Sequence, residues 1–122
     1  MQIHRSTTPY ELGRAAAGRA AALIRAAIEE KGRADIILAT GASQFEMLRR
    51  LVQEDVDWKK VTMFHLDEYL DLPPAHPASF RKYLRERFVD QVGELQAILF
   101  IEGDAPDPQA ECVRLNALIG RH

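Results

Sequence analysis

Cysteine, long apolar runs and an excess of charge of either sign are nearly absent from this sequence. Its one cysteine, Cys112, excludes an internal disulfide, fits a reducing cytoplasm and is expected to be a half-buried helix residue. No apolar run approaches the roughly 20 residues that cross a bilayer, and residues 1–5 lack the apolar core of a signal peptide. The net charge of −2 provides no electrostatic footprint for nucleic acid. We therefore expect a cytoplasmic protein without membrane or nucleic-acid partners.

Helical and strand-like patterns alternate along the chain. Short apolar runs, typical of strands covered on both faces, lie at residues 35–40, 61–66 and 97–101. Helical spacing of apolar residues lies at 9–31, 43–53, 79–92 and 108–118. This alternation predicts an α/β fold with a parallel sheet of about three strands and four flanking helices. The sheet is narrow, and a fourth strand would be expected after the last helix. We therefore expect residues 1–122 to be one α/β domain that is the N-terminal part of a larger one.

Two helices carry clear signals for their ends. Thr8 can cap the first helix, with Pro9 at its first position and Glu11 placed to complete a capping box. Gly32 suits the end of that helix, and Asp107 suits the start of the last one.

Two adjacent carboxylates, Asp67 and Glu68, follow the apolar run at 61–66. Ligands in open α/β folds bind at the carboxyl ends of the strands, so an acid there can act as a general base on a rigid support. Adjacent strand residues point to opposite sides, and we choose Asp67 to face the pocket. Glu68 is the second catalytic candidate, although orienting its neighbours or pairing with an arginine suits it better. The alternative is that both acids only cap or solvate a loop.

A glycine turn follows the apolar run at 35–40. Thr40, Gly41, Ala42 and Ser43 lie where a strand ends and a helix begins, and free backbone N–H groups at such a point attract anions. No lysine stands where a Walker loop requires one. The candidate role is phosphate binding, and the alternative is a plain turn capped by Ser43.

The histidines give weaker signals. His65 lies within an apolar run and is expected to be a hydrogen-bonded core residue. His76 lies in a proline-rich loop, where it either contacts a ligand or organises the turn. No pair of histidines has the spacing of metal ligands, so no metal site is predicted.

Basic and aromatic side chains recur between residues 69 and 88. The basic ones are expected to form a solvated helix face: Arg81, Lys82, Arg85 and Arg87. The aromatic ones are expected to pack in the core: Tyr69, Phe80, Tyr83 and Phe88.

The stretch at 61–92 strongly resembles the glucosamine-6-phosphate deaminase/isomerase family. The resemblance rests on a Phe-x-x-Asp-Glu-Tyr core at 64–69, a His-Pro-x-Ser-Phe segment at 76–80, the turn at 40–43 and a Gly-Asp-Ala-Pro-Asp segment at 103–107. It implies an open Rossmann-like sheet and no metal or organic cofactor. It also implies conversion of an amino sugar phosphate to fructose 6-phosphate and ammonia. Asp67 would move a proton between C2 and C1 through an enediol-like intermediate, and the turn at 40–43 would help to hold the sugar phosphate.

Departures from the family pattern qualify this resemblance. The family commonly has glycine, threonine and proline where this chain has Ala42, Ser43 and Gln44, and asparagine at the position of His65. The family's later Gly-His-Ile-type motif, with its ring-opening histidine, and its phosphate-binding basic residues do not occur in these 122 residues. We therefore expect the first half of a family member, with little deaminase activity by itself. Assembly into a homo-oligomer remains open. The alternatives are a 6-phosphogluconolactonase, a non-catalytic sugar-phosphate-binding module or a fragment with no independent role.

Overall fold

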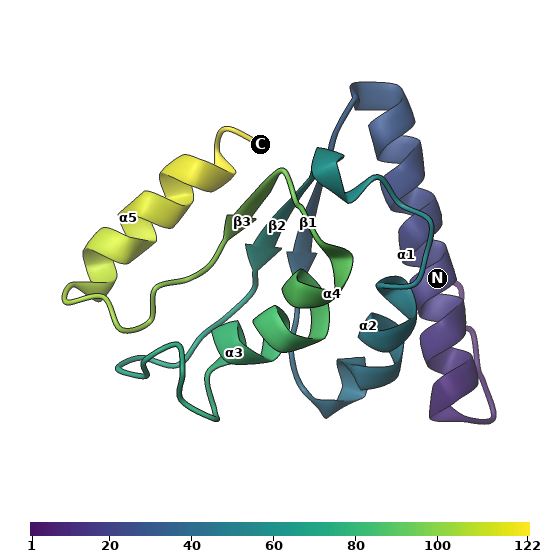
Figure 1. Cartoon of the computed structure of the whole chain (residues 1–122), viewed down its shortest axis with the longest axis horizontal. Helices are drawn as coiled ribbons and strands as arrows, with labels where there is room; N and C mark the ends of the chain where they lie inside the picture. The colour runs from purple at the N-terminus through teal and green to yellow at the C-terminus, as the bar shows by residue number, and fades with distance from the viewer.

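The computed structural model describes all 122 residues and contains one three-stranded parallel sheet (Figure 1). The strands are β1 (Ala34–Leu38), β2 (Val61–His65) and β3 (Ala97–Leu99), in the order β1-β2-β3. In the register of the sheet, Ala34 lies opposite Val61, and Phe64 lies opposite both Ile37 and Leu99. The predicted α/β fold with a three-stranded parallel sheet and four helices is confirmed.

Four helical segments flank the strands. They are α1 (Pro9–Lys31), α2 (Phe45–Leu51), a continuous run of α3 (Phe80–Leu84), a π-helical turn (Arg85–Val89) and α4 (Asp90–Val92), and finally α5 (Pro108–Ile119). Short 3₁₀ turns precede α2 at Ala42–Gln44 and β2 at Trp58–Lys60. The π-helical turn was not predicted, because the apolar pattern at 79–92 fits an uninterrupted α-helix.

Most of the predicted helix ends are confirmed. The Thr8 hydroxyl accepts a hydrogen bond from the Glu11 N–H at 3.1 Å, and Gly32 ends α1 in the left-handed conformation with φ of 75°. Asp107 caps α5 by accepting from two N–H groups of its first turn. The capping box differs from the prediction, since the Glu11 carboxylate accepts from the N–H of Thr7 rather than from that of Thr8.

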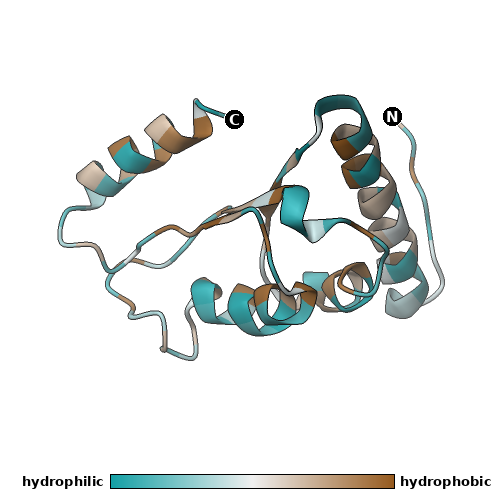
Figure 2. Ribbon diagram, turned by 45° about the horizontal axis from the view of Figure 1, so that its top comes forward, coloured by the Kyte–Doolittle hydropathy of each residue, from teal (hydrophilic) through white to brown (hydrophobic).

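The main core lies on one face of the sheet. Figure 2 shows α2, α3 and α4 together on this side, and α1 packs against α2. The residues at the centre of this core are almost fully inaccessible to solvent: Ala17, Ala21, Leu48, Leu51, Val61, Met63, Leu84 and Phe88. Small alanines on α1 allow α1 to approach α2 closely, which explains why an alanine-rich helix can form part of a core.

The opposite face of the sheet is only partly covered. The C-terminal segment reaches it, where the His122 ring contacts Phe64 edge-on at 5.4 Å and pairs with Asp35 at 2.9 Å. Ile37 stays 59% exposed on this face, and Ile119 stays 52% exposed at the end of α5. The molecule therefore has one well-packed layer of helices and one loosely covered layer.

Cys112 and Tyr69 are among the side chains whose exposure differs from the sequence-based expectations. Cys112 is exposed rather than half-buried. Tyr69 is 53% exposed and packs on Phe80 at the surface instead of entering the core.

None of the helices is both long and apolar enough to span a bilayer.

Candidate functional site

The glycine turn and the acidic pair leave the sheet at the same edge. β1 and β2 are parallel and adjacent, so their carboxyl ends lie side by side. The backbone continues this pairing just past the strands, where the Leu66 N–H donates to the Leu38 oxygen at 3.1 Å. The two segments that the sequence singled out are therefore neighbours in space.

Asp67 is exposed at this edge. Its carboxylate makes no hydrogen bond and no ion pair within the chain. It follows β2 by two residues, so the buried strand anchors its backbone. A carboxylate with free lone pairs on a supported strand end can accept a proton from a ligand.

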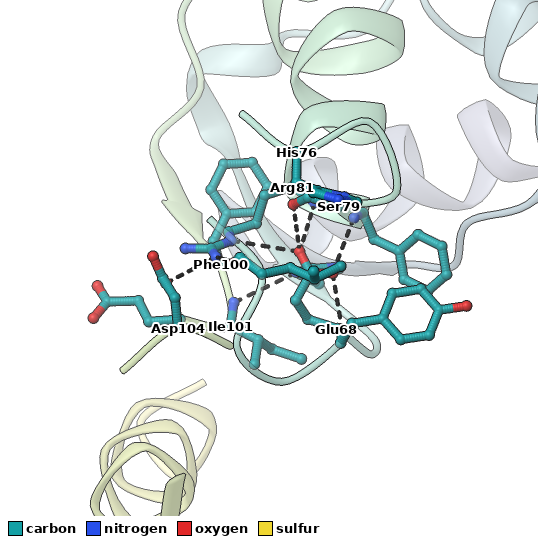
Figure 3. A network of polar contacts seen from close by, with 12 residues as sticks. Glu68, His76, Ser79, Arg81, Phe100, Ile101 and Asp104 are labelled. Atoms are coloured by element: carbon teal, nitrogen blue, oxygen red, sulfur yellow. Dashed lines mark hydrogen bonds and ion pairs between the residues drawn. The ribbon is translucent and has the colours of Figure 1, made fainter. Parts of the chain in front are cut away.

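Glu68 has the opposite environment (Figure 3). Its side chain is fully buried. Its two oxygens accept four hydrogen bonds of 2.8–3.0 Å, from the N–H groups of Tyr69, Phe80 and Arg81 and from the hydroxyl of Ser79. Burial by itself raises the pKa of the Glu68 carboxyl, but these hydrogen bonds outweigh burial and hold the pKa below its ordinary value of 4.5. Glu68 is therefore an ionised and fully engaged group.

Arg81 is buried against Glu68, so the expectation that it lies on a solvated face is wrong. Its side chain is 8% exposed, and its Nε lies 3.4 Å from the Glu68 carboxylate. Its Nη2 donates to the Leu72 oxygen at 2.8 Å and pairs with Asp104 at 2.8 Å. Arg81 thus joins the acidic loop, helix α3 and the loop after β3. The sequence predicted that Glu68 orients its neighbours or pairs with an arginine, but it did not identify Arg81 as the partner.

Tyr83 connects the same helix to the glycine turn. Its hydroxyl donates to the Gly41 oxygen at 2.8 Å, and its ring stacks on Phe45 with centroids 5.7 Å apart. Burial raises the pKa of the Tyr83 hydroxyl, although the nearby Arg87 opposes this. Sequence reasoning placed Tyr83 in the core and missed this contact, because no local pattern indicates a partner 42 residues away.

The glycine turn has the sharp backbone bend that was predicted, but no side chain caps the helical turn that follows it. Gly41 has φ of 108°, which L side chains rarely adopt. No side chain caps the 3₁₀ turn that follows, so Ser43 does not have the capping role of the alternative interpretation. Ala42 and Ser43 are exposed and line a hollow of about 900 Å³ between the turn and the chain near residues 6–16. Asp67 does not line this hollow, and Thr40 is half-buried.

The two central histidines have structural contacts. His65 is 5% exposed, and its Nδ1 accepts a long hydrogen bond from the Ile101 N–H at 3.5 Å. Burial, opposed by the charges of Glu68 and Asp67, lowers the pKa of the His65 imidazole. His76 is exposed, and its Nδ1 accepts from the Ala78 N–H at 3.1 Å, which organises the proline-rich turn. No group of three or more possible metal-binding side chains comes together in the chain.

Three comparisons place this geometry among known proteins. The family described as glucosamine-6-phosphate isomerases/6-phosphogluconolactonase matches residues 7–121. A glucosamine-6-phosphate deaminase of Exiguobacterium sp. is 40% identical over 90 residues, which are 72% of this chain and 35% of that protein. A monomeric glucosamine-6-phosphate deaminase superposes with a TM-score of 0.85 at 29% identity, over 99% of this chain and 51% of the other.

A 6-phosphogluconolactonase of Shewanella baltica shares the fold, with a TM-score of 0.78 at 18% identity over 88% of this chain and 46% of the other. The chain thus spans about a third to a half of the length of these relatives. The family match extends over nearly all of the sequence, and the acidic strand end lies within it. This chain belongs to the glucosamine-6-phosphate isomerase/6-phosphogluconolactonase family.

Proposed function

We propose that this chain forms part of a sugar-phosphate site of the glucosamine-6-phosphate deaminase type, acting in carbohydrate metabolism. The observation that carries the proposal is the free Asp67 carboxylate on a strand end beside the Gly41 turn. Relatives named as glucosamine-6-phosphate deaminases, 33–40% identical over parts of the chain, support this choice of substrate.

In the proposed reaction, the Asp67 carboxylate removes the C2 proton of the open-chain sugar and returns it to C1. An enediol-like intermediate, which still carries the nitrogen on C2, lies between the two transfers. Protonation at C1 leaves an iminium at C2; water then adds to C2 and the C2–N bond breaks, which releases ammonia and fructose 6-phosphate. The turn at 40–43 holds the phosphate through backbone N–H groups and the Thr40 and Ser43 hydroxyls, with His76 as a further contact. This proton transfer requires no metal and no organic cofactor.

Glu68 acts in this proposal through its neighbours rather than on the substrate. Its oxygens already accept four hydrogen bonds, and its side chain is fully buried. A carboxylate with this many donors has little capacity left to take up a proton.

A paired substitution tests the role of Asp67. Asp67→Asn keeps the size of the side chain and removes the base, and Asp90→Asn makes the same change at an exposed acid on α4. The chain is incubated with glucosamine 6-phosphate or fructose 6-phosphate in D₂O, and deuterium incorporation is followed by NMR. Because general base catalysis contributes roughly 10²–10⁴-fold, Asp67→Asn should slow incorporation by about 100-fold or more with little change in sugar-phosphate affinity. Asp90→Asn should match the parent chain.

Three outcomes distinguish the alternatives. Equal incorporation by Asp67→Asn and the parent chain, or no binding of either sugar phosphate, contradicts the proposal. Hydrolysis of 6-phosphogluconolactone in a parallel assay, without deuterium incorporation, indicates the lactonase type instead. Sugar-phosphate binding without any Asp67-dependent chemistry indicates a non-catalytic binding module. Ammonia release is measured in the same samples, and we predict little of it from this chain alone.

A further inference from the structure

Contacts with other segments fix the path of the loop that carries Asp67, but none of these contacts involves the Asp67 side chain. Asp71 has a left-handed backbone with φ of 59°, and its N–H donates to the Gly103 oxygen at 2.9 Å. Gly103 packs so closely that an added Cβ would lie 2.2 Å from the Tyr69 oxygen and 2.9 Å from the Glu68 Cγ. This loop therefore leaves no room for a side chain at residue 103, and its path is set by contacts outside the loop.

Glu68 fastens the start of the loop to the first turn of α3. The Phe80 and Arg81 N–H groups, which lack partners inside the helix, both donate to this one carboxylate. The Ser79 hydroxyl donates to it as well, at 2.8 Å. Arg81 in turn holds the end of the loop through the Leu72 oxygen. Both ends of the acidic loop are thus attached to one helical turn.

The same helix fastens the glycine turn. Tyr83 lies three residues after Phe80 on α3, and its hydroxyl holds the Gly41 oxygen at 2.8 Å. The Arg87 guanidinium lies over the Phe45 ring, 4.0 Å from its centroid, and 5.1 Å from the centroid of Tyr83. This stack restricts the rotamer of Tyr83 and keeps its hydroxyl on Gly41.

We infer that Glu68, Arg81 and Tyr83 are positioning residues that use helix α3 as a strut between the Asp67 loop and the Gly41 turn. The position of the Asp67 loop relative to the Gly41 turn, beyond the paired strand ends, is then held by α3 before any ligand binds. Holding a base and a phosphate cradle in fixed relation contributes strongly to catalysis, because a misplacement of about 1 Å can cost about 100-fold in rate. The functional consequence, although not the strut itself, rests on the function proposed above.

The strut is tested by loosening each attachment separately. Glu68→Gln retains the shape of the side chain and removes its charge, and Tyr83→Phe removes a single oxygen. Backbone ¹⁵N relaxation on the ligand-free chain is the first measurement. Glu68→Gln should lower the order parameters of residues 67–71 from roughly 0.85 toward 0.6. Tyr83→Phe should do the same at residues 40–43, and each substitution should leave β2 unchanged.

The second measurement is the Asp67-dependent deuterium incorporation. Both variants should slow incorporation at least tenfold. The dissociation constant for the sugar phosphate should change less than twofold in Glu68→Gln, whereas Tyr83→Phe, which loosens the phosphate turn, should also weaken binding. Arg81→Lys should retain only part of the parent chain's rate, because lysine lacks the planar fork of donors. Two matched controls should incorporate deuterium at the same rate as the parent chain. Glu86→Gln changes an exposed acid that pairs with Lys82 in the same helical run, and Tyr10→Phe changes an exposed tyrosine on α1.

Unchanged order parameters in a folded Glu68→Gln or Tyr83→Phe variant would overturn the inference. A loss of order spread over the whole chain would also overturn it, because that result indicates general stabilisation rather than positioning. If Asp67→Asn shows that Asp67 is not a base while the local loss of order still appears, the proposed function fails and the strut remains.

Discussion

Two adjacent carboxylates, Asp67 and Glu68, have opposite surroundings although both lie in the loop that follows β2. Glu68 meets the N–H groups at the start of α3, which favour its charged form, whereas Asp67 is left exposed. From the sequence we expected Glu68 to pair with an arginine, which the structure confirms, whereas the choice of Asp67 as the base stays a prediction. The sequence did not identify Arg81 as that arginine, because three other basic residues follow within six positions.

At the scale of this residue, we predict an acid-dependent loss of stability. The folded-state pKa of Glu68 lies below its ordinary value of 4.5, so its contribution is present above about pH 4.5 and is lost as the pH falls through the folded-state pKa. Glu68→Gln should lower the free energy of unfolding at pH 7 by about 1–3 kcal/mol, as expected for a charged, hydrogen-bonded group.

The measurement is urea unfolding between pH 7 and pH 3. The curve of Glu68→Gln should be flatter than that of the parent chain below pH 4.5. Some dependence should remain, because hydrogen bonds from Arg114 also lower the pKa of the Glu111 carboxyl. Two parallel curves would show that Glu68 does not account for the acid sensitivity. Glu86→Gln at an exposed site is the control.

Among the elements, the contact between α1 and α2 depends on one glycine. Gly13 is buried on α1, and an added Cβ would lie 2.6 Å from the Glu46 Cβ and 2.7 Å from the Glu46 carbonyl carbon. Gly18, on the same helix, has nothing within 4 Å of an added Cβ. The two glycines look alike in the sequence, and only the docking of α2 distinguishes them.

At this scale we predict opposite effects of the same substitution. Gly13→Ala should destabilise the chain by about 1–3 kcal/mol, because the helices must separate to relieve an overpacked contact. Gly18→Ala should stabilise it by roughly 0.5–1 kcal/mol, because alanine favours the helix. Chemical denaturation of both variants measures the difference. Equal effects, of either sign, would mean that α1 and α2 are not in close contact at Gly13.

At the scale of the whole molecule, one sheet face has little cover, and the two outer strands, β1 and β3, each pair on one side only. β1 pairs only with β2, and Ile37 on its open face is 59% exposed. Unpaired strand edges and exposed apolar side chains favour association with other chains. Because of this unpaired edge and this exposed apolar side chain, a homo-oligomer stays one of our predictions.

At the scale of the molecule, we predict self-association through this face. Ile37→Lys should reduce association at high protein concentration, because a charged side chain on an edge strand opposes pairing, and it should cost little stability at so exposed a site. Leu23→Lys, at an exposed position on α1, is the matched control and should leave association unchanged. Sedimentation velocity over a concentration series measures this. A parent chain that stays monomeric throughout would show that the face does not associate.

The sequence by itself determined the alternation of elements, the caps of α1 and α5 and the placement of the acidic pair and the glycine turn at strand ends. These features depend on residue spacing and on contacts within a few positions, which a sequence displays directly. The tertiary structure decided which arginine is buried, which tyrosine holds Gly41 and which glycine has no room for a side chain. These depend on how separate elements dock, since the partners of Arg81 and Tyr83 lie 13 and 42 residues away along the chain. A local sequence pattern does not indicate contacts between residues so far apart along the chain, so the contacts through α3 could be identified only from the folded structure.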